Sequence, residues 1–333
     1  MAVQQYCVCH HCRDGHASKE KLAFMVGKYH KECQTCTEDE RCPAELALDV
    51  EKKDAFKDLR TAVDDYLIHK DIADHQAAAM RMAKEQLSEG ECLVIEDFAG
   101  RFLVKADLEL SQNDYFARFG VPDLVVCVYF KEKGDTKCEI FNFLANTKEK
   151  EDFYFLREAW VALLDTPLMK RFRNIKIFSD GGPKHFKIRK SLFLFSLLQD
   201  AYPQNFQWNF FQSCHGKGPC DSHAGMLKNL LKKEVLRGEI IHDEEELYDL
   251  FKAKAKAHTI MLDITRQEVD CAEFKQGIKK FFCFEYCGEG KVKCFQKTGD
   301  EKFVLQTITS KYAEFLPYHD SQAHRALPMD LSS

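Results

Sequence analysis

The stretch NIKIFSDGGPKHFK, residues 174–187, is the strongest indication of the fold. Its first six residues form a short apolar run typical of a buried β-strand, and Asp180 follows that run at once. The glycines and the proline of residues 181–183 predict a turn directly after the aspartate. The segment therefore predicts a strand that ends in an acidic side chain beside a flexible loop.

The neighbouring segments predict an ordered series of strands and helices. Apolar or alternating runs predict strands at residues 92–97, 102–110, 124–131, 137–145 and 206–213, and helical patterns cover about 151–172, 186–201 and 222–237. Several antiparallel strands, followed by helix, strand, helix, strand and helix, is the order of an RNase H-like core. We therefore expect an α/β fold over residues 91–238, an RNase H-like mixed five-stranded sheet flanked by helices.

Length and charge limit the class of protein. A chain of 333 residues predicts about two folded units. The balance of 48 basic and 53 acidic residues gives a net charge of −5, so any contact with nucleic acid requires a local basic surface. No apolar run approaches the ~20 residues of a membrane span, and the start does not resemble a signal peptide. We therefore expect no membrane partner and a reducing compartment, in which the fifteen cysteines are core thiols or metal ligands.

The first 43 residues are rich in cysteine and histidine. Two ligand clusters separated by a short polar stretch are typical of a structural zinc module, because four soft ligands must converge from two turns. The candidate ligands are Cys7, Cys9, Cys12, His30, Cys33, Cys36 and Cys42. There are more candidates than one site needs, so the four ligands are not identified. The alternative is the remnant of a larger module with some unligated cysteines.

The remaining segments divide the chain further. Residues 44–90 have no proline or glycine between Pro43 and the SEGE that closes the segment, and their apolar residues recur at helical spacing. Residues 239–333 predict a helix, a small β-meander with turns at GEG and TGD, and a frayed tail. We therefore expect a zinc module, a helical region, the α/β core and a small C-terminal α+β extension.

Three aspartates occupy related positions in the predicted core. Asp97 closes the first strand, Asp180 follows a later one, and Asp221 opens the helix after the last. Carboxylates at these positions would converge on one edge of the sheet, where they would hold Mg²⁺ ions for phosphoryl transfer. Each aspartate has a structural alternative as a turn or helix cap. Glu96 would replace Asp97 if the strand register shifted by one, and Glu109 is also within reach of such a cluster.

Basic and thiol groups surround two of these aspartates. Lys184 and Lys187 follow Asp180, whereas His215 and Lys217 precede Asp221, and Lys228 lies on the helix after it. Basic groups beside carboxylates favour a phosphate-facing surface, so we expect these five residues to contact DNA; an ordinary solvated face is the alternative for the helix lysines. Cys220 and His223 form a CxxH pair, for which we expect a structural role near the metal site.

The same residues carry a resemblance to a known family. FSDGGPKHFK at 178–187, WNFFQSCHGKGPCDSHAGMLK at 208–228 and VIEDFAGRF at 94–102 resemble the motifs of eukaryotic DDE-type transposase catalytic domains. The resemblance covers about residues 90–237. It departs from the family at His185, where Gln is common, and at Ser222 and His223, where Gly is common.

The resemblance implies an enzyme that cleaves DNA and transfers the cut strand. Asp97, Asp180 and Asp221 would bind Mg²⁺ or Mn²⁺, with Glu234 as an alternative third ligand. Water would cut one strand, and the freed 3′ hydroxyl would attack target DNA. DNA as the partner implies a nuclear location; a homodimer is compatible, and no organic cofactor is expected. The two alternatives are a catalytically inactive domesticated copy that binds DNA or protein, and an RNase H-like nuclease without strand joining.

Overall fold

The computed structural model describes residues 14–15, 17–21, 50–103, 120–181, 185–213, 215–216, 218–266, 274, 277–288 and 290–308. The chain divides into two compact units, Met1–Ala77 and Ala78–Ser333. Most of the long helix α3 (Val50–Glu85) belongs to the first unit, where Val63, Tyr66 and Ala73 are buried. This helix falls within the predicted helical region.

The second unit is built on a large mixed sheet. In the described residues this sheet has nine strands in the order β11-β10-β9-β7-β6-β1-β4-β5-β8. The strands are β1 (Glu91–Phe98), β4 (Asp123–Glu132), β5 (Asp135–Ala145), β6 (Asn174–Ser179), β7 (Asn205–Phe210), β8 (His258–Leu262), β9 (Cys283–Gly288), β10 (Lys291–Phe295) and β11 (Phe303–Thr307). The mixed α/β class is therefore confirmed, but the sheet is larger than the five strands expected.

The pairing directions define the centre of the sheet. Strand β1 pairs antiparallel with β4 and parallel with β6, β4 pairs antiparallel with β5, and β6 pairs parallel with β7. The predicted strand at 102–110 is not among them. Within the described residues it contributes only β2 (Phe102–Leu103), which pairs with β3 (Gly120–Val121) in a separate small sheet.

The C-terminal residues extend the same sheet. Strand β8 pairs parallel with β5 at one side, and β9 pairs antiparallel with β7 at the other. Helix α8 (Glu244–Lys254) precedes β8 and packs on it. The expected C-terminal extension is therefore an integral part of the main sheet, because its strands form backbone hydrogen bonds with strands of the predicted core.

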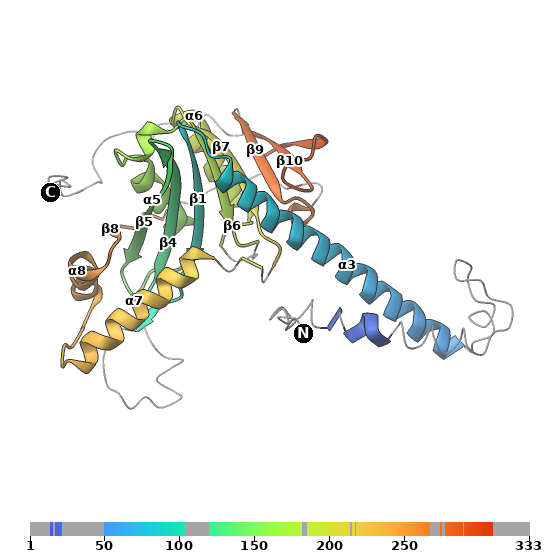
Figure 1. Ribbon diagram of the computed structural model, residues 1–333, viewed down its shortest axis with the longest axis horizontal. Helices are drawn as coiled ribbons and strands as arrows, with labels where there is room; N and C mark the ends of the chain where they lie inside the picture. Colours follow the sequence, from blue (N-terminus) through green and yellow to red (C-terminus); the bar gives the residue numbers. More distant parts are fainter. Residues whose placement is uncertain are drawn as a thin grey trace. The chain divides into compact units, whose positions relative to one another are not determined.

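Helices cover both faces of the sheet. Helix α7 (Pro219–Leu236) crosses the front of the sheet in Figure 1, and it contacts β1 and β4. Helices α5 (Phe153–Leu164) and α6 (Arg189–Ala201) contact each other on the opposite face. Within the described ranges, none of the helices combines the length and hydropathy that crossing a bilayer requires.

Local sequence explains where these helices begin and end. The carboxylate of Asp152 accepts hydrogen bonds from the backbone N–H groups of Tyr154 and Phe155 at 3.0 and 3.3 Å, which caps the start of α5. The helical pattern predicted over about 151–172 contains Pro167, and helix α5 ends three residues before this proline, at Leu164. Proline occupies the first position of α7, where its missing N–H has no partner to lose.

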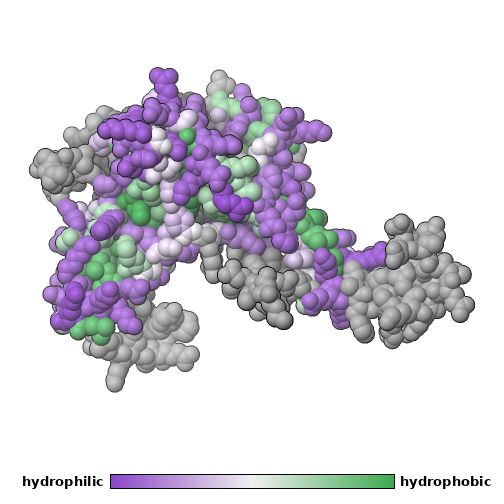
Figure 2. Space-filling view, viewed as in Figure 1, coloured by the Kyte–Doolittle hydropathy of each residue, from purple (hydrophilic) through white to green (hydrophobic). Residues whose placement is uncertain are grey.

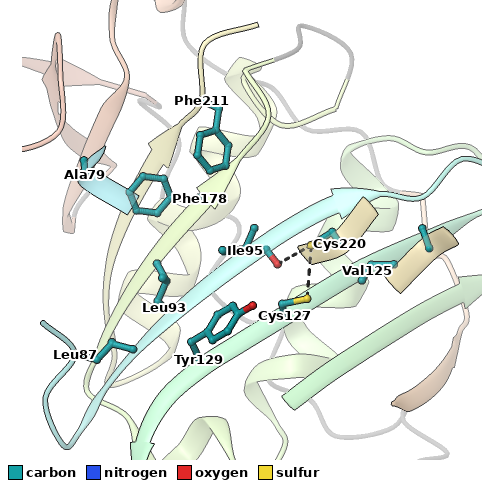
Figure 3. Close-up of a cluster of buried hydrophobic side chains, with 11 residues drawn as sticks. Ala79, Leu87, Leu93, Ile95, Val125, Cys127, Tyr129, Phe178, Phe211 and Cys220 are labelled. Atoms are coloured by element: carbon teal, nitrogen blue, oxygen red, sulfur yellow. Dashed lines mark hydrogen bonds between the residues drawn. The ribbon is translucent and has the colours of Figure 1, made fainter. Parts of the chain in front are cut away.

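A hydrophobic cluster lies between α7 and the sheet. It contains Leu93 and Ile95 of β1, Val125 and Cys127 of β4, and Cys220 of α7, together with Tyr129, Phe178, Phe211, Ala224 and residues at the end of α3 (Figure 3). Burying each large apolar side chain contributes about 1.5–3 kcal/mol. Because α7 packs on the central strands, the apolar residues of this cluster are buried. The visible surface in Figure 2 is mostly hydrophilic.

Candidate functional site

The three predicted aspartates lie toward one edge of the sheet. Strands β1 and β6 run parallel, with Glu96 opposite Ser179. Asp97 and Asp180 are the next residues of the two strands' segments, so they lie at the same edge of the sheet. Asp221 stands in the first turn of α7, which packs on β1 and β4. The charges of Asp221 and Asp180 both act on Asp97, so the three carboxyl groups lie within electrostatic reach of one another.

Asp97 is the most strongly perturbed of the three. Burial, followed by the negative charges of Asp221 and Asp180, raises the pKa of Asp97 from 3.8 to about 7. Burial and these charges therefore favour the neutral form of the Asp97 carboxyl group. A bound cation would remove the repulsion and favour the charged form, and such perturbed carboxyl groups are typical of functional sites.

The donor chemistry of this group suits a hard cation. Three aspartates supply the carboxylate oxygens that Mg²⁺ and Mn²⁺ prefer. Among the described residues, however, no three His, Cys, Asp or Glu side chains are arranged so that they already hold a metal ion. The three aspartates are therefore coupled through their charges but do not form a metal-binding group in the described structure.

A small pocket opens beside Asp97. Its volume is about 150 Å³, and it lies between the end of β1 and the first turns of α7. Asp97 and Asp221 line it together with Cys220 and Lys228. The Lys228 ammonium donates a hydrogen bond of 2.8 Å to the carbonyl of Ala99. The pocket therefore presents two carboxylates and one ammonium group at the edge of the sheet.

Lys187 is not on the surface. Its side chain is 5% exposed, its Nζ donates a 3.3 Å hydrogen bond to the carbonyl of Lys279, and it lies 3.7 Å from the centre of the Phe282 ring. Burial lowers the pKa of Lys187 to about 7, against the opposing effect of the Asp180 charge. This position does not support the expected contact with a DNA phosphate.

The other predicted DNA contacts are only partly described. Lys184 and Lys217 lie outside the described residues. His215 is half-buried in the loop before α7, where its backbone N–H donates to the carbonyl of Gln212. Lys228 is exposed at the pocket. Of the three predicted contacts that the structure describes, Lys228 is therefore the one that is exposed and lines the pocket.

Cys220 and His223 pack inside the unit. The Cys220 thiol lies 3.2 Å from the carbonyl oxygen of Ile95 and 3.8 Å from the sulfur of Cys127, as Figure 3 shows. His223 is 4% exposed, and burial lowers its pKa. The Cys220 contacts join the start of α7 to β1 and β4, and the described structure does not place Cys220 and His223 with a third metal-type ligand.

The alternative acids lie elsewhere. Glu96 points to the opposite face of the sheet from Asp97, because neighbouring strand residues alternate. Glu234 forms ion pairs with Arg237 at 2.7 Å and Lys254 at 2.5 Å near the other end of α7. Glu109 lies outside the described residues. Asp97 and Asp221 therefore fit the pocket better than their described alternatives.

Two further acids near the site were missed by sequence reasoning. Glu151 raises the pKa of both Asp97 and Asp123, so it lies near both carboxyl groups. Asp123 starts β4, is fully buried, and has no hydrogen-bond partner for either carboxylate oxygen. Burial raises its pKa well above 3.8, against the opposing charge of Lys228. The only signal in the sequence is an acid at the start of the apolar run LVVCVYF.

The predicted zinc ligands cannot be assessed in the same way. Cys7, Cys9, Cys12, His30, Cys33, Cys36 and Cys42 all lie outside the described residues. The zinc module therefore stays a prediction.

Comparison with known proteins yields one match. No curated protein and no solved structure matches the chain. Residues 76–286, more than half of the chain and all of its central strands, match the family described as "Domain of unknown function (DUF8701)". The chain therefore belongs to the DUF8701 family.

Proposed function

We propose that the chain is a DDE-type transposase, or a protein derived from one, that cleaves DNA and transfers the cut strand in a metal-dependent reaction. The order of the five central strands supports an RNase H-like core. Along the chain these strands are β1, β4, β5, β6 and β7. Across the sheet they lie in the order β5-β4-β1-β6-β7, so that the first strand of the chain is in the middle. Only the second runs antiparallel to the others, which is the arrangement of RNase H-like folds.

The grouping of the acids carries the proposal. Asp97 lies at the end of the first of these strands, where the negative charges of Asp180 and Asp221 raise its pKa. Buried like charges raise one another's free energy, and divalent cations relieve this repulsion. Mg²⁺ or Mn²⁺ bound by these three residues would activate the attacking oxygen and stabilise the leaving oxygen.

The chain's own side chains would position the DNA. The Lys228 ammonium, next to the carboxylates in the pocket, would bind a backbone phosphate and hold the scissile bond near Asp97. His215, in the described part of the loop after β7, would extend this contact. Lys184 and Lys217 lie outside the described residues, and their contacts with DNA are proposed from the sequence alone. The proposal includes a nuclear location and a zinc module in residues 1–43.

A nicking assay tests the proposal. The full chain is incubated with an end-labelled DNA duplex and Mg²⁺ or Mn²⁺, and wild type is compared with Asp180→Asn. Asp249→Asn is a matched control, because Asp249 is an exposed acid on α8. We expect metal-dependent nicks from wild type and from the control, and none from Asp180→Asn. Equal activity of all three proteins would refute the assignment of Asp180.

The products separate the alternatives. Transfer of the labelled end into a target plasmid supports the transposase, whereas nicks without joining support a simple nuclease. If wild type and Asp180→Asn both shift DNA in a gel and neither cuts it, the chain is a binding protein with an inactive site. Zinc in the purified full chain, lost on replacing the cysteines of residues 1–43, would test the N-terminal module separately.

A further inference from the structure

A chain of buried hydrogen bonds lies on the face of the sheet opposite the pocket. The indole N–H of Trp160 on α5 donates to one carboxyl oxygen of Glu96 at 2.8 Å. The hydroxyl of Ser179 donates to the other oxygen at 3.0 Å, and the indole N–H of Trp208 on β7 donates to that hydroxyl. These hydrogen bonds therefore link α5, β1, β6 and β7.

Two residues of this hydrogen-bond network are direct neighbours of the aspartates in the sequence. Glu96 immediately precedes Asp97, and Ser179 immediately precedes Asp180. The two residues also lie opposite each other in the parallel pairing of β1 and β6. Their hydrogen bond therefore joins the two strands one residue before each aspartate.

All four side chains are out of contact with water. Trp160 and Glu96 are each 1% exposed, and Ser179 and Trp208 are fully buried. Glutamine has the same shape as Glu96 and keeps the network when its oxygen accepts from Trp160 and its amide N–H donates to the Ser179 oxygen. Loss of the serine hydroxyl instead leaves the Trp208 indole N–H and one Glu96 oxygen buried without these partners.

We propose that Trp160, Glu96, Ser179 and Trp208 form a positioning network that fixes the ends of β1 and β6, and with them Asp97 and Asp180, relative to each other. These are positioning residues, because none of them lines the pocket. The positioning of the strand ends does not depend on the proposed function. Only the expected effect of the network on catalysis rests on it. Functional groups must be held within about 0.5 Å of their working geometry, so a link one residue away is effective.

The composition of the chain offers a direct assay. The sequence contains two tryptophans, and both indole N–H groups belong to the network. The full chain labelled with ¹⁵N-tryptophan should therefore show two indole signals, both slow to exchange with deuterium. Hydrogen exchange of the backbone in residues 96–99 and 179–181 is measured on the same samples by mass spectrometry.

Ser179→Ala is the main variant and Glu96→Gln the conservative one. We expect Ser179→Ala to speed the exchange of the Trp208 indole and of both strand ends at least tenfold, and Glu96→Gln to stay within about threefold of wild type. Thr166→Val is the matched control, since it removes a buried hydroxyl that bonds to Leu163 within α5 and its following turn. It should lower stability without selective exchange at the strand ends.

The outcomes separate this inference from the proposed function. It is overturned if Ser179→Ala leaves either strand end unchanged, or if Thr166→Val loosens both ends equally. Trp208→Phe removes the N–H donor together with part of the buried ring, and it replaces Ser179→Ala if that variant does not fold. If wild type nicks DNA, Ser179→Ala should lower kcat with little change in DNA affinity. If wild type does not nick, the proposed function fails and the exchange data still decide the inference.

Discussion

Replacing Lys187 by methionine should stabilise the second unit at neutral and acidic pH. The Lys187 ammonium is buried, and its pKa falls from 10.5 to about 7. A difference of about 3.5 pKa units corresponds to roughly 5 kcal/mol, at about 1.36 kcal/mol per unit. The hydrogen bond to Lys279 and the contact with Phe282 are lost in the variant, and they offset about 1–3 kcal/mol of the gain. We therefore expect a net gain of about 2–4 kcal/mol.

The pH dependence follows from the direction of the shift. Between pH 7 and 10.5 the unfolded chain binds a proton at Lys187 that the folded chain has released, so wild type gains stability as pH rises through this range. The penalty is fully present below pH 7 and absent above about pH 10.5. The advantage of Lys187→Met should therefore be constant below pH 7 and shrink above it.

Thermal and denaturant unfolding between pH 6 and 10 measure this difference. A gain of 2–4 kcal/mol should raise Tm at pH 6 by about 4–16 °C in a unit of this size, at about 2–4 °C per kcal/mol. Lys170→Met, at an exposed lysine, should leave Tm unchanged at every pH. A variant that is less stable than wild type at pH 6, or an advantage that does not change with pH, would refute the reasoning.

Three further predictions concern the same unit. The pKa of Asp97 in the folded state is raised to about 7, so wild type should lose stability as pH rises from about 4 to 7. Asp97→Asn should remove this loss, and unfolding measured at pH 5 and pH 8 checks the difference. Millimolar Mg²⁺ should raise the Tm of wild type but not of Asp180→Asn in the same buffer. Phe195→Ala should cost about 3–5 kcal/mol in urea unfolding, because this fully buried ring packs against Trp160 and Trp208.

Local patterns were sufficient to predict the central strands. The run NIKIFS forms β6 over its full predicted length, and the run at 92–97 lies within β1. Each combines apolar side chains with a clear break, so neighbouring residues alone determine the strand. The described part of the strand predicted at 102–110 is β2, which pairs outside the main sheet, because alternation alone does not reveal which partner strand is available.

Long-range pairing limited the rest of the prediction. Strand β9 was expected in a separate meander, yet it pairs with β7, more than 70 residues earlier in the chain. No local pattern specifies such a partner. The burial of Lys187 follows from the same pairing, since Lys279 and Phe282 just before β9 cover its ammonium group. A lysine beside a glycine-rich turn was therefore wrongly expected at the surface.

The perturbed groups at this edge of the sheet form a pattern. Glu96, Asp97, Asp123 and Lys187 all have pKa values shifted toward their neutral forms, with burial as the largest cause. Burial of one such group is a packing detail, but four around the ends of neighbouring strands concentrate unfavourable electrostatic free energy in one place. A bound cation would lower the contribution of Asp97, because it supplies the opposite charge. Asp97→Asn, which should stabilise the fold at neutral pH, should therefore weaken Mg²⁺ binding, and unchanged Mg²⁺ binding would argue for packing alone.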